Sequence, residues 1–217
     1  MTLDLQKLFS WLSPGYPVGA FTYSHGMEWA IADGRVQNAS TARAWIADCL
    51  EHGAGRSDAI LLVAAHRAVT AADAAALTEI SDLAFALAPS AERLLETDAQ
   101  GQAFSEVTGA VWGSDQSSAL PYAVALGAEA ARHGIAVEPT VEMFLHAYVA
   151  NLISACVRLV PMGQTDGQKV LAELMPQVRS VADDAQSSDL DDLGGCTILA
   201  DIASMKHETQ DVRLFRS

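Results

Sequence analysis

One stretch, Val141–Val160, limits what this chain can fold into more than any other. It reads VEMFLHAYVANLISACVRLV, is apolar around most of its circumference, and lies between Pro139 and Pro161. Because proline is accepted at the start of a helix but not in its interior, the two prolines bracket one helix of about five turns. The polar side chains fall on two nearly opposite edges, with Glu142 and His146 on one and Asn151, Ser154 and Arg158 on the other. Such a helix needs neighbours on two sides, so we expect the other segments to pack around it.

A membrane-spanning helix is the alternative interpretation of this stretch, since its length would allow one. The polar side chains within it would then lie at bilayer depth, which costs kilocalories for each of them. No basic flank sets an orientation across a membrane either. We therefore expect it to be the central helix of a soluble bundle.

The rest of the chain is also predicted to be helical, because alanine is abundant and alternating β-branched residues are scarce. The prediction is an all-α bundle of about eight to ten helices that forms one domain over residues 1–217. Residues 181–195, VADDAQSSDLDDLGG, contain five aspartates and no basic residue, which predicts a mobile acidic loop. Residues 206–217 are expected to form a C-terminal tail.

The composition limits which partners the chain can bind and in which compartment it can work. Thirteen Lys and Arg against 27 Asp and Glu give a formal net charge of −14, which disfavours nucleic acid and anionic membrane surfaces. The three cysteines are far apart and form no CxxC pair, as is typical of a reducing compartment. No signal peptide is evident at the N-terminus, so a cytoplasmic protein is expected.

No motif for catalysis or for tight metal binding is present. The sequence lacks a GxSxG elbow, a P-loop, a GxGxxG that opens a helix after a strand, and an HExxH. Cys49 with His52, and His25 with Glu28, are spaced three residues apart, but nothing nearby completes a ligand set, so we interpret them as packing and surface residues. The prediction is a protein that is not an enzyme and has no catalytic residue, metal or cofactor.

Two segments differ from what a generic bundle requires. Residues 13–30, SPGYPVGAFTYSHGMEWA, combine four aromatic residues, three glycines and two prolines, which a packed turn between helices could explain. The last twelve residues hold three of the thirteen basic residues, next to Leu214 and Phe215. This end is either disordered or a docking segment that orders against a partner with Phe215 as its anchor.

Four blocks of the sequence resemble the urease accessory protein F (UreF) family. The first is WLSPGYPVGAFTYSHGMEWA, near the N-terminus. The others follow in the family's order: ETDAQGQAF at 96–104, NLISACVRLVPMGQTDGQ at 151–168, and DIASMKHETQDVRLFRS at 201–217. Together they extend over nearly the whole chain.

The resemblance implies an all-α homodimer that acts as a scaffold or chaperone in urease maturation. Such a protein joins a UreD/UreH-type accessory protein and the GTPase UreG to apo-urease for GTP-dependent nickel insertion, and it is a candidate regulator of UreG. The resemblance places the contacts with the UreD-type protein at the C-terminus: Lys206, His207, Glu208, Arg213, Leu214, Phe215 and Arg216. Candidates for dimer contact or internal packing are Tyr23, His25, Glu28, Arg158, Gln164 and Asp166.

A second hypothesis is that the chain activates GTP hydrolysis through an arginine inserted into the nucleotide site of UreG. It requires an exposed arginine on a flexible segment. Arg35, after Asp33-Gly34, and Arg56, after Gly53-Ala54-Gly55, are the candidates. A stand-alone helical ligand-binding protein is the third reading.

Overall fold

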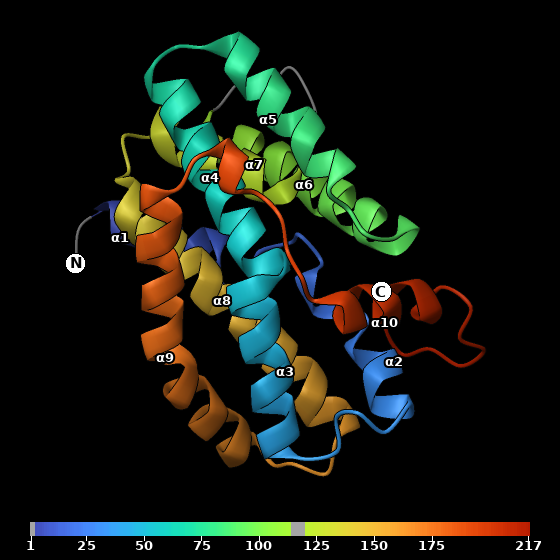
Figure 1. The fold of residues 1–217 in the computed structure, drawn as a ribbon. Coiled ribbons are helices and arrows are strands. Elements are labelled where there is room, and N and C mark those ends of the chain that lie inside the picture. Colours follow the sequence, from blue (N-terminus) through green and yellow to red (C-terminus); the bar gives the residue numbers. More distant parts are fainter. Residues whose placement is uncertain (1–2, 114–119) are drawn as a thin grey trace.

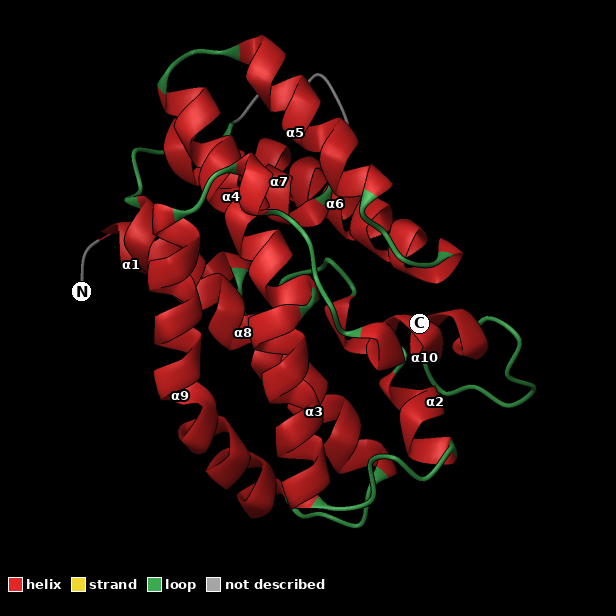
Figure 2. Ribbon diagram, viewed as in Figure 1, coloured by secondary structure: helices red, strands yellow, loops and turns green. Residues whose placement is uncertain are grey.

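The computed structural model describes residues 3–113 and 120–217, and every regular element within these ranges is a helix (Figures 1 and 2). The α-helices are α1 Leu3–Trp11, α2 Met27–Ala32, α3 Ala39–His52, α4 Ala54–Thr70, α5 Ala74–Ala86, α6 Ala91–Trp112, α7 Tyr122–Arg132, α8 Val137–Leu159, α9 Gln164–Ser187 and α10 Ile198–His207. Two short 3₁₀-helices are η1 Ala20–Thr22 and η2 Leu190–Asp192. The predicted all-α bundle is confirmed.

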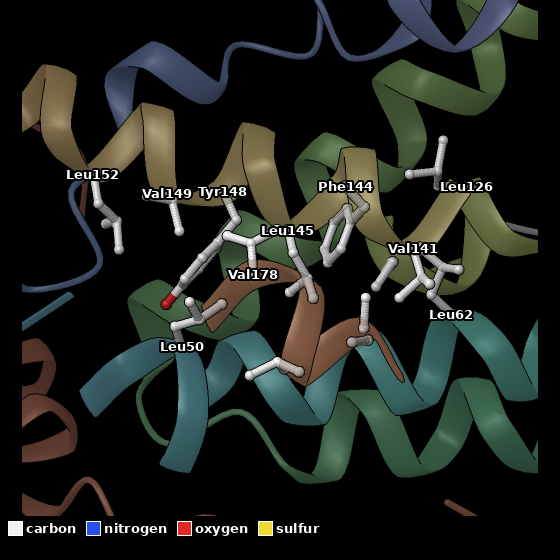
Figure 3. Close-up of a cluster of buried hydrophobic side chains, with 14 of the residues drawn as sticks. Leu50, Leu62, Leu126, Val141, Phe144, Leu145, Tyr148, Val149, Leu152 and Val178 are labelled. Atoms are coloured by element: carbon white, nitrogen blue, oxygen red, sulfur yellow. The ribbon is translucent and has the colours of Figure 1, made fainter. Parts of the chain in front are cut away.

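Helix α8 is the central helix that the sequence predicts. It contacts α2, α3, α4, α7 and α9, and its apolar side chains pack with Leu50, Leu62 and Val178 from α3, α4 and α9 (Figure 3). It begins at Val137, earlier than expected, because Pro139 fits in the first turn, where its missing N–H needs no partner. Within the described ranges it alone is long and apolar enough to cross a membrane, and 56% of its most apolar stretch is buried in the bundle.

The prediction of an acidic loop at residues 181–195 is wrong for its first half, residues 181–187. Helix α9 continues through Pro176 to Ser187, because Val181, Ala182 and Ala185 bury an apolar face against the bundle. Arg56 Nε donates to Asp184 Oδ2 at 2.7 Å, so one of the aspartates is paired. Aspartate content alone could not reveal this buried face, and the connection to α10 starts only at residue 188.

Two helices of the core approach so closely that only glycine fits between them. A Cβ at Gly127 in α7 would lie 2.2 Å from the carbonyl oxygen of Leu62 in α4. Carbon and oxygen atoms that are not bonded cannot come so near, so any larger residue must force the helices apart. The α4–α7 contact therefore depends on the absence of a side chain at this position.

We predict that Gly127→Ala lowers the free energy of unfolding by about 2 kcal/mol or more, although alanine favours an isolated helix by about 1 kcal/mol over glycine. Urea denaturation measures the change. Gly15→Ala, in the turn after α1, is the control for a glycine that has room for a side chain, because a Cβ there meets only Ser13 Oγ, at an ordinary 3.8 Å. Equal stability of the two variants would contradict the close approach.

Candidate partner-binding surface

The two unusual segments of the sequence lie against each other, because α2 packs on α10 (Figure 1). Gly26 precedes α2 with a φ of 75°, and a Cβ there would lie 2.5 Å from the backbone nitrogen of Ser204. Glycine alone accepts both this dihedral angle and this proximity. The SHG sequence at 24–26 thus brings the start of α2 onto the backbone of α10.

Glu28, in the first turn of α2, is buried and holds the C-terminal segment, which we define as residues 208–217. The Leu214 N–H donates to Glu28 Oε1 at 2.7 Å and the Phe215 N–H donates to Oε2 at 2.8 Å. His207 Nε2 lies 3.2 Å from Oε2. A buried carboxylate is costly unless it is hydrogen-bonded, and here the chain's own C-terminus supplies the donors.

Backbone hydrogen bonds to the turn before α2 extend this attachment. The Arg216 N–H donates to the Thr22 carbonyl oxygen at 2.7 Å, and the Ser24 N–H donates to the Ser217 carbonyl oxygen at 2.6 Å. The Ser24 hydroxyl donates to the same oxygen of Ser217. Phe215 is buried between these contacts, so the C-terminal segment is part of the packed structure.

Helix α6 contributes further contacts to the same segment. Glu92 Oε2 lies 2.6 Å from His207 Nδ1, and Arg213 Nη1 donates to Glu92 Oε1 at 2.7 Å. The Ala91 N–H, at the start of α6, donates to Glu208 Oε1 at 2.8 Å. The end of α10 and the C-terminal segment are therefore attached to both α2 and α6.

The residues predicted to bind a partner fall into two groups. His207 and Phe215 are buried within the chain, where they fasten the segment, so neither side chain reaches a partner in this arrangement. The exposed members are Lys206, Glu208, Arg213, Leu214 and Arg216.

Sequence reasoning missed an apolar face on α10. Ile198, Ile202 and Met205 are 66%, 39% and 49% exposed, and their spacing of four and three residues places them on one side of the helix. Ala203, Ser204 and His207 on the other side are buried. Large exposed apolar patches often mark interaction surfaces, so this face is a candidate partner-binding surface. The spacing was visible in the sequence, but only the fold shows which side is covered.

The two arginines proposed to reach a GTPase both form hydrogen bonds within the chain. Arg35 lies in the exposed connection after α2, where its Nε donates to Asp33 Oδ2 at 2.7 Å. Arg56 was expected on a flexible segment, and this expectation is wrong. The chain re-enters a helix at Ala54, so Arg56 lies in the first turn of α4 and donates to both Asp184 and the carbonyl oxygen of Asp192.

The candidates for dimer contact or packing also include both buried and exposed residues. Tyr23 and Glu28 are buried, and His25 packs edge-on against the ring of Tyr148. Arg158 and Gln164 are exposed. The Arg158 guanidinium lies 4.2 Å from the centroid of the Phe215 ring. Asp166 accepts a hydrogen bond from Lys169 Nζ at 2.9 Å.

Comparison with known proteins identifies the family. A sequence model of the UreF family matches residues 36–175. The urease accessory protein UreF of Rhodopseudomonas palustris is 51% identical over 222 residues, which cover 99% of this chain and 94% of the relative. The chain belongs to the UreF family. Its counterpart from Cereibacter sphaeroides is 51% identical over 217 residues, all of both chains, and that of Methylorubrum populi is 48% identical over 223 residues, 99% of this chain and 100% of the relative.

The resemblance seen in the four sequence blocks is thereby confirmed. Membership of the UreF family makes this chain a urease accessory protein, and its role lies in urease maturation. Two of those blocks supply the residues of the attachment described above: the SHG sequence with Glu28, and the C-terminal block from Asp201.

A cavity of about 790 Å³ lies beside the turn that precedes α2 in this UreF chain. Its lining extends from exposed aromatic residues, Phe9 and Phe21, to a buried charged cluster that includes Arg93 and Glu96. Glu96 Oε2 also accepts a hydrogen bond from Ser217 Oγ at 2.8 Å, so the cluster touches the C-terminal segment. Among the described residues, no group of three or more His, Cys, Asp or Glu is placed to hold a metal ion.

The two carboxylates near Arg93 have pKa values shifted in opposite directions. Burial alone would raise the pKa of Glu96, but the charge of Arg93 and the His25 imidazole, 2.9 Å from Oε1, outweigh it and lower the pKa to about 2. At Asp58, which is 4.0 Å from Arg93, burial outweighs the weaker attraction and raises the pKa to about 6. Burial and the charge of Arg93 lower the pKa of His25.

These shifts have opposite consequences for stability. The folded pKa of Glu96 is below its unfolded value, so its ionised form stabilises the protein above about pH 4.5 and this contribution is lost as the pH falls toward 2. The folded pKa of Asp58 is above its unfolded value, so stability declines as the pH rises from about 4 to about 6.

We predict that Glu96→Gln lowers the free energy of unfolding at pH 7.5 by about 3 kcal/mol, because it leaves Arg93 buried without its main partner. Asp58→Asn should be neutral or stabilising at pH 7.5, and its advantage over the unmodified chain should shrink at pH 5. Urea denaturation at both pH values tests the pair. A larger loss from Asp58→Asn than from Glu96→Gln would show that the charges are assigned the wrong way round.

Proposed function

We propose that this chain is a non-enzymatic scaffold of urease maturation. It links a UreD/UreH-type accessory protein and the GTPase UreG to apo-urease for GTP-dependent nickel insertion, acting in the cytoplasm as a homodimer. Nickel is cargo in this proposal, not a resident cofactor. The observation that carries it is the exposed apolar face of α10, on a helix whose other side is fixed to α2 and α6. A surface held in this way serves association and requires no nucleophile.

The UreD-type protein is the proposed occupant of the α10 face. Family resemblance assigns that contact to the C-terminal block from Asp201, in which the exposed large apolar side chains are Ile202, Met205, Val212 and Leu214. Ile198 and Leu199, earlier in α10, are exposed as well. Lys206, Arg213 and Arg216 are exposed charged residues of the same block. An apolar centre with charged residues around it is the usual composition of a protein–protein interface.

We propose that dimer formation and contact with UreG use parts of the surface other than the α10 face. Phe9 and Phe21 are exposed large aromatic side chains near the cavity, and aromatic residues are enriched in interfaces between proteins. Regulation of GTP hydrolysis is proposed for Arg35 and, after its pair with Asp184 opens, for Arg56.

We predict that Ile202→Asp abolishes co-elution with the UreD-type protein in size-exclusion chromatography, because a charge in the centre of an apolar interface is costly to desolvate. The free energy of unfolding should fall by about 1–2 kcal/mol, because Ile202 is only 39% exposed, so co-elution is measured under conditions in which the variant stays folded. Val111→Asp on α6 is the matched control, with a side chain 64% exposed away from α10. If both variants still co-elute, the α10 face is not the binding surface.

The two arginine candidates are tested by GTP turnover of UreG in the assembled complex. If Arg35 stabilises charge in the transition state, Arg35→Ala should lower the hydrolysis rate by about 10³-fold without dissolving the complex. We expect a smaller effect for Arg56→Ala, because Arg56 is held by Asp184. Unchanged turnover in both variants leaves the scaffold role alone.

A further inference from the structure

We propose that Glu28 is a positioning residue for partner binding: its buried carboxylate fixes the C-terminal segment so that α10 and residues 212–216 meet the partner in one prearranged form. This inference rests on the proposed docking at α10. Glu28 would contact no partner itself, because it is buried and both of its carboxylate oxygens are occupied from within the chain.

Glu28 joins parts of the chain that are far apart in sequence. Its oxygens accept from two consecutive amides, those of Leu214 and Phe215, and one of them also contacts His207 at the end of α10. Hydrogen bonds to a charged acceptor are about twice as strong as neutral ones. Two such hydrogen bonds on one carboxylate, with His207 beside it, make the arrangement of the C-terminal segment depend strongly on a single side chain.

A glutamine cannot replace this carboxylate. The side-chain amide has nearly the same shape, but its NH₂ group donates and would face one of the two backbone N–H groups. At least one amide of Leu214 or Phe215 would lose its acceptor, and the contact with His207 would lose its charge. Glu28→Gln therefore changes the chemistry of the attachment with little change in volume.

The attachment to Glu28 leaves side chains of the C-terminal segment exposed to a partner. With its backbone held, Val212 is 82% exposed and Leu214 is 64% exposed, while the ring of Phe215 is buried underneath. A partner that meets these side chains finds them already ordered. A free segment would lose conformational entropy on binding, and that loss would weaken the complex. The geometry thus favours tighter binding with the segment attached.

The experiment measures the Kd between the full chain and the UreD-type protein by calorimetry, well below the unfolding temperature of each variant. We expect Glu28→Gln to raise the Kd about tenfold or more, since each lost hydrogen bond to a charged group is worth that much. Glu138→Gln, which changes an exposed carboxylate at the start of α8, is the matched control and should leave the Kd unchanged.

A second pair of variants acts from the other side of the same contact. Leu214→Pro removes the amide that donates to Glu28, and Leu214→Ala controls for loss of the exposed side chain. Leu214→Pro should raise the Kd well beyond Leu214→Ala. Combined with Glu28→Gln, it should add little, because both changes break one attachment; general destabilisation would instead give additive effects.

The outcomes separate this inference from the proposed function. If Ile202→Asp abolishes binding while Glu28→Gln and Leu214→Pro leave the Kd unchanged, α10 docks the partner but Glu28 does not position it. Tighter binding by Glu28→Gln would also overturn the inference, because the attachment would then be inhibitory. If the unmodified chain fails to bind, or binds equally well with Ile202→Asp, the docking proposal fails and this inference fails with it.

Discussion

The arrangement of the C-terminal segment of this protein depends on a buried carboxylate that needs hydrogen-bond donors. Glu28 lies at the start of a short helix, away from water, and the donors it needs come from residues nearly the whole length of the chain away. Gly26 makes this possible, because it lets the start of α2 approach the backbone of α10 within contact distance. Without the hydrogen bonds to Glu28 the C-terminus would fray, and with them it has a defined position. The same hydrogen bonds explain why two distant, unusual segments of the sequence belong to one structural unit.

This unit connects the two surfaces for which association is proposed. On one side, the attachment leaves the apolar face of α10 exposed while burying the opposite face. On the other, the Ser217 hydroxyl donates a hydrogen bond to Glu96, which also contacts Arg93 and His25. These three residues line the cavity, together with Phe9 and Phe21. A scaffold that assembles several partners requires surfaces whose geometry is set before binding, and buried polar networks can set such geometry.

Much of the fold could be predicted from the sequence, and the reasons for success and failure are physical. Periodicity and flanking prolines predicted α8, since a nearly all-round apolar helix has few alternatives to a central position. The acidic stretch after Val181 was misjudged because its aspartates hide a buried stripe of Val181, Ala182 and Ala185, and local composition does not record which side is covered. The C-terminus was singled out correctly as unusual, but whether Phe215 faces a partner or its own chain depends on contacts with Glu28 that no local pattern encodes. The exposed side of α10 is invisible for the same reason.

Amide hydrogen exchange of the unmodified protein, followed by NMR at residues 211–217, tests the central claim most directly. If Glu28 holds the C-terminal segment, the amides of Leu214 and Phe215 exchange slowly, at rates that report opening of the attachment, while the neighbouring amide of exposed Val212 exchanges rapidly. Rapid exchange at all of these positions, alongside protection within α8, would contradict the account. The segment would then be free in solution, and Glu28 would have to find its donors elsewhere.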